Sequence, residues 1–151
     1  MIMGSFIAIL GILLIIPLLI GLAVYIVAAI SLTQMATNEG IPNPWLAWVP
    51  FANLYIVGKL IPEIKFSTYV IPSHEYVLPG AAVAVMLFSK VPLIGFLISI
   101  ANFVLVVYAF YLLFKRYVGD KAVLYTALSF LTCGIMLAVF LFTIKDQKAI
   151  S

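Results

Sequence analysis

Long apolar runs separated by short polar connections dominate the chain. The clearest run covers residues 6–30, contains no charged residue and has Pro17 near its centre. As a helix it would be about 38 Å long, which exceeds the roughly 30 Å hydrocarbon core of a membrane. It is also too long for the core of a signal peptide, so we expect a retained helix. Two further runs, 93–114 and 122–144, are long enough to cross and end at basic residues.

Two other apolar runs are irregular. Residues 45–61 are interrupted by Pro50, and this run fits either a short span or a broken helix at the membrane interface. Residues 76–88 would cover only about 20 Å as a helix, less than a full crossing. Together they supply one more crossing or two half-crossings. The fold class predicted is an all-α integral membrane protein, a single transmembrane domain over residues 1–151. It has about four transmembrane helices and one broken or interfacial segment.

Composition supports this assignment and excludes other classes. Hydrophobic residues make up 66% of the chain and charged residues 9%, against about 25% charged residues in an average soluble domain. A soluble enzyme, a disulfide scaffold and a disordered protein are therefore excluded. The net charge of +3 is not a nucleic-acid signature, because the basic residues lie near the ends of apolar runs.

The basic residues also predict an orientation. Lys115, Arg116 and Lys121 form the densest basic cluster in any short loop, and the positive-inside rule places that loop in the cytoplasm. These three residues are the expected topology anchors. A four-span arrangement then puts both termini on the outer side of the membrane.

Polar side chains within apolar runs are the candidates for a functional site. Asn102 lies about ten residues into its run, Asn53 follows Pro50, and Tyr108 lies deeper than the other tyrosines of its hairpin. Interhelical hydrogen bonds are the ordinary role of such groups, and lining a path for an ion or small molecule is the alternative. A second candidate is contact with the interface or with lipid headgroups, through Trp45, Trp48, Tyr55 and Lys59.

The residues needed for catalysis or metal binding are missing from this pattern. His74 is the single histidine. A stable zinc site needs at least three protein ligands, so we exclude a metal site of the usual kind, and we exclude a serine triad on the same ground. All five acidic residues fall in loops or tails, and no glycine-rich phosphate loop is present. We therefore predict a non-enzyme with no catalytic residues, no metal and no cofactor.

One segment carries a resemblance. Residues 44–55 read PWLAWVPFANLY, with Lys59 after them, and a later run contains Asn102 and ends at Lys115 and Arg116 before Gly119. This pattern resembles that of small bacterial multi-pass membrane proteins with a Pro-x-Trp-x-Ala-x-x-Pro-x-x-Asn-x-Tyr motif. Ser99 departs from it, standing where a proline is often found. The resemblance covers roughly residues 40–145 and implies a bacterial cytoplasmic-membrane protein of about four helices, with no established activity.

The leading functional prediction is a small non-enzymatic accessory or interaction subunit of a membrane complex or homo-oligomer. Its expected partners are the lipid bilayer and another membrane protein or a second copy, with no nucleic acid. Two alternatives stay open. One is a small channel or carrier with Asn53 and Asn102 along its path, and the other is a lipid-binding membrane protein.

Overall fold

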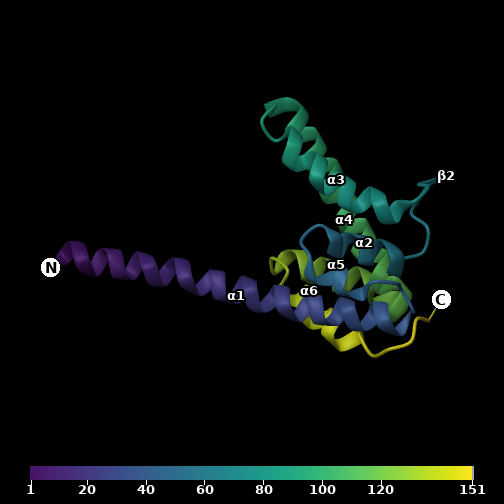
Figure 1. The fold of residues 1–151 in the computed structure, drawn as a ribbon, viewed down its shortest axis with the longest axis horizontal. Coiled ribbons are helices and arrows are strands. Elements are labelled where there is room, and N and C mark those ends of the chain that lie inside the picture. The colour runs from purple at the N-terminus through teal and green to yellow at the C-terminus, as the bar shows by residue number, and fades with distance from the viewer. Residues whose placement is uncertain (151) are drawn as a thin grey trace.

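The computed structural model describes residues 1–150, and it is predominantly helical (Figure 1). Its elements follow in the order α1 (Ile2–Asn38), the 3-10 helix η1 (Pro44–Trp48), α2 (Ala52–Leu60), β1 (Lys65–Phe66), β2 (Tyr69–Val70), α3 (His74–Phe88), α4 (Pro92–Val118), η2 (Gly119–Lys121), α5 (Ala122–Leu131) and α6 (Ile135–Ile144). Two stretches of the described chain are long and apolar enough to cross a membrane: α1, and Pro92–Leu131, which contains α4, η2 and α5.

Helix α1 is longer than the expected run 6–30 at both ends and continues through Pro17. The polar residues after 30 continue the helix, and their hydroxyl groups find partners by bonding back to the carbonyl groups of the preceding turn. Ser31 Oγ donates to Val27 O at 2.7 Å, and Thr33 Oγ1 donates to Ala29 O at the same distance. The connection between α1 and η1 is therefore limited to residues 39–43.

The N-terminal half of α1 projects away from the rest of the molecule (Figure 1). Every residue from Met1 to Leu10, and from Ile12 to Ala23, is exposed. The C-terminal half packs into the body instead, where Leu32, Met35 and Ala36 are buried. Helix α1 thus has one unpartnered half and one half in the core.

The segment 45–61 forms a broken helix, and its place at a membrane interface stays a prediction. Helix η1 ends at Trp48, Phe51 adopts a φ of 66°, and α2 begins at Ala52. Tyr25 Oη donates to Trp48 O at 2.5 Å, so the break lies beside the middle of α1. The chain therefore runs back along α1 in η1 and returns in α2 towards the end at which α1 finishes.

Helices α3 and α4 form a second projecting arm, which leaves the body in a different direction from α1 (Figure 1). A small antiparallel β-hairpin precedes it, with Lys65 opposite Val70. At the tip the helices approach closely because Gly95 has no side chain. A Cβ built at Gly95 would lie 2.7 Å from Phe88 O.

The single helix expected over 122–144 is wrong: the structure has two ten-residue helices, α5 and α6, which pack against each other. The break is stabilised by backbone and side-chain bonds. Gly134 has a φ of 90° and donates its N–H to Ser129 O at 2.8 Å, and Thr132 Oγ1 accepts the N–H of Met136 at 3.1 Å. Gly134 therefore forms the turn between α5 and α6.

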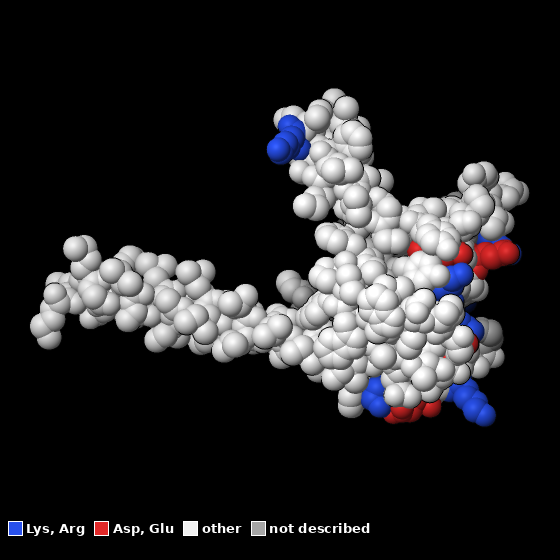
Figure 2. Space-filling view, viewed as in Figure 1, with Lys and Arg blue, Asp and Glu red and all other residues white. Residues whose placement is uncertain are grey.

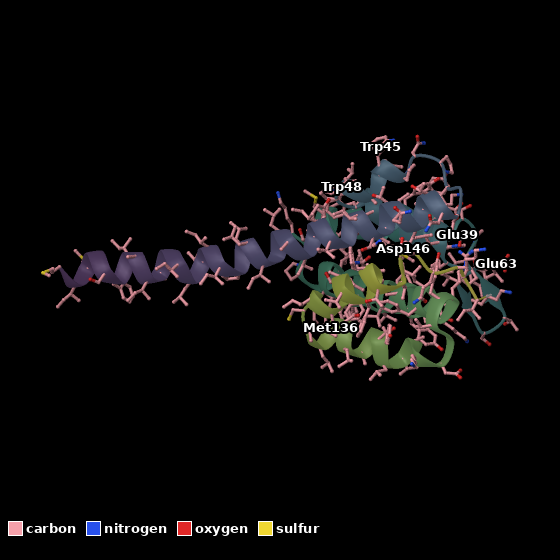
Figure 3. The ribbon with its side chains drawn as sticks, turned by 90° about the horizontal axis from the view of Figure 1, so that it is seen from below. Glu39, Trp45, Trp48, Glu63, Met136 and Asp146 are labelled. Atoms are coloured by element: carbon pink, nitrogen blue, oxygen red, sulfur yellow. The ribbon has the colours of Figure 1, made fainter. Side chains whose placement is uncertain are left out.

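This break changes the expected topology. Ile150 N–H donates to Arg116 O at 2.8 Å, and Asn38 Nδ2 donates to Lys145 O at 2.9 Å. Residues 145–150 thus lie at the same end of the molecule as the 119–121 turn, although a four-span arrangement puts them at opposite ends. Figure 3 shows Asp146 near Glu39 and Met136 towards the other end of the body.

The hydrophobic core lies where α1, α2, α4 and α6 meet. Met35, Ile56, Leu113 and Leu141 are buried there. Aromatic rings fill the space beside α5: Tyr125 stacks on Phe140 with centroids 4.0 Å apart, and Phe114 meets both rings edge-on. The core fixes the helix ends that carry the charged residues.

Candidate functional site: the charged end and the Asn102 groove

Charged groups gather at the end of the body that lies opposite the N-terminus, as Figure 2 shows. They come from the ends of helices and the loops that join them: Glu39, Lys59, Glu63, Lys65, Glu75, Lys115, Arg116, Asp120, Lys121, Lys145, Asp146 and Lys148. Lys90 is the exception, since it lies in the turn at the tip of the α3–α4 arm. The long apolar faces of α1 and α4 lead away from this charged end.

Arg116 joins three helices at the charged end. Its guanidinium donates to Leu60 O at the end of α2, and it pairs with Glu39 Oε2 after α1 at 2.8 Å. Tyr117 Oη donates to the other carboxylate oxygen of Glu39 at 3.3 Å. The side chains of Arg116 and Glu39 are 21% and 27% exposed, so this pair is partly shielded from water. Arg116, expected as a topology anchor, therefore also holds the ends of α1 and α2 against α4.

The other two expected anchors differ from Arg116. Lys115 Nζ lies 5.8 Å from the centroid of the Tyr111 ring, a cation–π geometry. Lys121 ends the 3-10 turn η2 and is exposed. Beside them, a polar hollow of about 670 Å³ is lined by Asn38, Glu39, Arg116, Asp146, Gln147 and Lys148. Its lining contains side chains of both signs of charge.

Lys59 forms an ion pair within the chain. Its Nζ lies 3.2 Å from Glu75 Oε1, and it also lies 5.7 Å from the Tyr55 ring centroid. The Glu75 backbone N–H and then the Lys59 ammonium lower the pKa of the Glu75 carboxyl below its usual range. Tyr55 contacts Tyr76 with centroids 5.4 Å apart. Two of the residues expected at lipid headgroups thus bind α3 to α2.

The two tryptophans, unlike Tyr55 and Lys59, are mainly exposed. Trp45 is 58% exposed and Trp48 is 44% exposed, and Figure 3 shows them on the outer side of the body. Tryptophan rings of this kind are typical of a membrane–water boundary. Of the four residues expected at the interface or at lipid headgroups, Trp45 and Trp48 are therefore the two that lie on the outer side of the body.

The three expected intramembrane polar residues do not come together. Asn53 lies at the start of α2, where its backbone N–H donates to Val49 O at 3.0 Å. Tyr108 donates to Lys65 O at 3.2 Å and stacks on Tyr111. It lines an apolar hollow of about 440 Å³ beside α5, with Phe103 and Thr126. Asn102 lines a different hollow, between α3 and α4, and Asn53 is not among its lining residues.

The Asn102 groove lies between α3 and α4 and has a volume of about 580 Å³. It is lined by Val77, Ala81 and Ala84 of α3 and by Ile98, Ala101 and Asn102 of α4. The Asn102 side chain is partly exposed, but its Oδ1 is buried and accepts no hydrogen bond from the described residues. This groove therefore combines an apolar surface with one amide group.

Three important residues were not singled out by the sequence pattern. Glu39 lies in a polar connection, and nothing local to it indicates a partner 77 residues away. Gly58 resembles any small residue of an apolar run, although α3 packs directly on it. Tyr25 could have been identified from the sequence. Its hydroxyl group lies well inside a charge-free run, and a hydroxyl group in such surroundings needs a hydrogen-bond partner.

No protein-family model, curated protein or solved structure matches the chain. In residues 1–150, no three His, Cys, Asp or Glu side chains are grouped so that they could hold a metal ion.

Proposed function

We propose that the chain is a multi-pass protein of the bacterial cytoplasmic membrane that acts as a non-enzymatic interaction subunit. It would associate through the exposed half of α1, with a second copy of itself or with another membrane protein. The observation that carries this proposal is that α1 projects a long, charge-free apolar surface that no other element of the described chain covers.

The dimensions of α1 support insertion into a bilayer. Residues 2–22 would be about 31 Å long, close to the roughly 30 Å hydrocarbon core. They include large exposed side chains such as Leu14 at 69% and Leu18 at 71%. In water this surface would be strongly unfavourable. The gathering of charges at the opposite end of the body is consistent with that end lying at the polar boundary.

A pairing face on α1 supports the interaction role. Gly4, Ala8 and Gly11 recur at spacings of four and three residues, which places them on one side of the helix. A Cβ built at Gly4 or Gly11 would meet nothing within 4 Å, so this small-residue face is open. Such faces allow two membrane helices to approach closely.

The first experiment tests both parts of the proposal on the full chain. Membranes containing the protein are washed with alkaline carbonate, and the protein is then purified in mild detergent for mass measurement. We expect it to stay in the membrane pellet, and then to be purified as an oligomer or with a second protein. Release by carbonate, or a strict monomer with no companion, contradicts the proposal.

Cysteine cross-linking then tests the pairing face, in a Cys133→Ser background. Gly11→Cys lies on the small-residue face, and Leu13→Cys lies on the opposite side of the helix, two residues and about 200° away. If two copies pair through this face, oxidation links Gly11→Cys chains and leaves Leu13→Cys chains largely monomeric. Equal linking at both positions would contradict pairing through this face.

A further inference from the structure

The amide of Asn102 lacks a partner that proteins normally provide. Its Oδ1 is buried and accepts no hydrogen bond from the described residues, although the side chain lines the groove between α3 and α4. Buried polar atoms of native proteins are nearly always hydrogen-bonded. Rotation about χ2 exchanges the oxygen and nitrogen of the amide, so either end can be turned towards the groove. With its oxygen turned towards the groove, the amide can accept a hydrogen bond from a group that enters it.

The groove has the size and surface of a site for a lipid-like molecule. Its volume of about 580 Å³ falls in the range of roughly 300–1,000 Å³ usual for ligand sites. Ala81, Ala84 and Ala101 keep it hollow because their side chains are small. The helices meet closely at the tip beside Gly95, so the groove opens between that contact and the body.

The position of Asn102 defines the polar group of the occupant. Asn102 lies 14 residues before Arg116 on α4, about 21 Å from the charged end. No charged residue lines the groove, so an ionised group would be unpaired there. A hydroxyl group both donates and accepts hydrogen bonds, so it can bond whichever end of the amide faces the groove.

We propose that the α3–α4 groove binds a neutral long-chain lipid whose hydroxyl group hydrogen-bonds the Asn102 amide. Its hydrocarbon chain lies against Ala81, Ala84 and Ala101. This site goes beyond the interaction role proposed for α1, because it uses a different arm of the molecule and a different class of partner.

Photolabelling in vesicles tests this site. The full chain is placed in phosphatidylcholine vesicles with one of two probes, hexadecanol carrying a mid-chain diazirine or the matching hydrocarbon without the hydroxyl. Labelled groove peptides are quantified by mass spectrometry for the native chain and for Asn102→Leu. For the alcohol we expect the native chain to be labelled about fivefold more than Asn102→Leu, the effect of one hydrogen bond. For the hydrocarbon we expect a ratio near one.

A pair of phenylalanine variants makes the test independent of Asn102. Ala84→Phe fills the groove and should abolish labelling by both probes. Val83→Phe adds the same ring at the neighbouring exposed position, which does not line the groove, and should leave labelling intact. If Asn102→Leu fails to fold, the alcohol must still label groove peptides in Val83→Phe and not in Ala84→Phe.

The contrary outcomes are also distinct. Equal native-to-variant ratios for the two probes overturn the site, as does labelling spread evenly over the groove and the exposed half of α1. If the protein stays in the membrane during the carbonate wash but fails the labelling tests, only the lipid site is contradicted. If carbonate releases the protein, the proposed function is contradicted.

Discussion

Glu75 packs directly on Gly58: a Cβ built at position 58 would lie 2.5 Å from the Cα of Glu75. The first turn of α3 thus rests on the backbone of α2, and the neighbouring Lys59 closes the contact with its ion pair to Glu75. The α3–α4 arm therefore begins from a fixed base, even though it projects from the body.

Adding a methyl group at this contact should weaken the base of the arm. Gly58→Ala forces α3 away from α2, because the clashing atom is backbone and cannot rotate aside. We expect a loss of about 1–3 kcal/mol in the free energy of unfolding, the usual range for overpacking. Thermal unfolding in detergent, followed by circular dichroism, measures it. Gly80→Ala is the matched control, since it lies in α3 with open space around it and should be neutral or stabilising.

The Lys59–Glu75 pair should make the α2–α3 contact sensitive to acid. The pKa of Glu75 is lowered in the folded chain, so its contribution is complete above the ordinary glutamate pKa of about 4.3. That contribution is lost as the pH falls through the lower folded value. Hydrogen exchange at the first turn of α3 should therefore accelerate over this acidic range in the native chain. The Glu75→Gln variant should lack that step, and an identical pH profile in both chains would contradict the prediction.

The Glu39–Arg116 pair should contribute measurably to stability because it is partly shielded and hydrogen-bonded. A double-mutant cycle with Glu39→Gln and Arg116→Ala should give a coupling free energy of about 1 kcal/mol or more. The same cycle with Glu63→Gln and Lys65→Ala provides the control, because that pair is 60–63% exposed. We expect its coupling to be about 0–0.5 kcal/mol. Equal coupling in the two cycles would show that Arg116 does not hold the helix ends.

The break between α5 and α6 predicts which groups share a side of the membrane. In a Cys133→Ser background, Lys121→Cys and Lys148→Cys should react with a membrane-impermeant maleimide from the same side of sealed vesicles. A continuous helix over 122–144 would place these residues on opposite sides. Reaction from opposite sides would therefore restore the four-span arrangement and refute the α5–α6 hairpin in the membrane.

Gly134 should be essential for that hairpin. Its φ of 90° is strained for any other residue, so Gly134→Val should destabilise the turn by about 1–3 kcal/mol. Cys133 also has a positive φ, of 52°, and Cys133→Gly should be neutral or slightly stabilising at the same turn. Thermal unfolding of the two variants, compared with the native chain, checks both signs.

The sequence by itself determined the helical class and most helix positions. Apolar runs that lack charge and turn residues favour helices, and α1, α3 and α4 contain the expected runs 6–30, 76–88 and 93–114. The sequence also identified Asn102 as unusual, because an amide within an apolar run needs a partner wherever the chain folds.

Only the tertiary structure decided where helices break and which ends meet. Residues 122–144 are apolar throughout, so hydrophobicity cannot distinguish one long helix from two short ones. That choice rests on bonds such as Gly134 N–H to Ser129 O and on packing between α5 and α6. In the same way Glu39 and Arg116 are 77 residues apart, and their pairing exists because the core brings the ends of α1 and α4 together. Local pattern fixes local conformation, whereas contacts between distant residues depend on the packing of the whole chain.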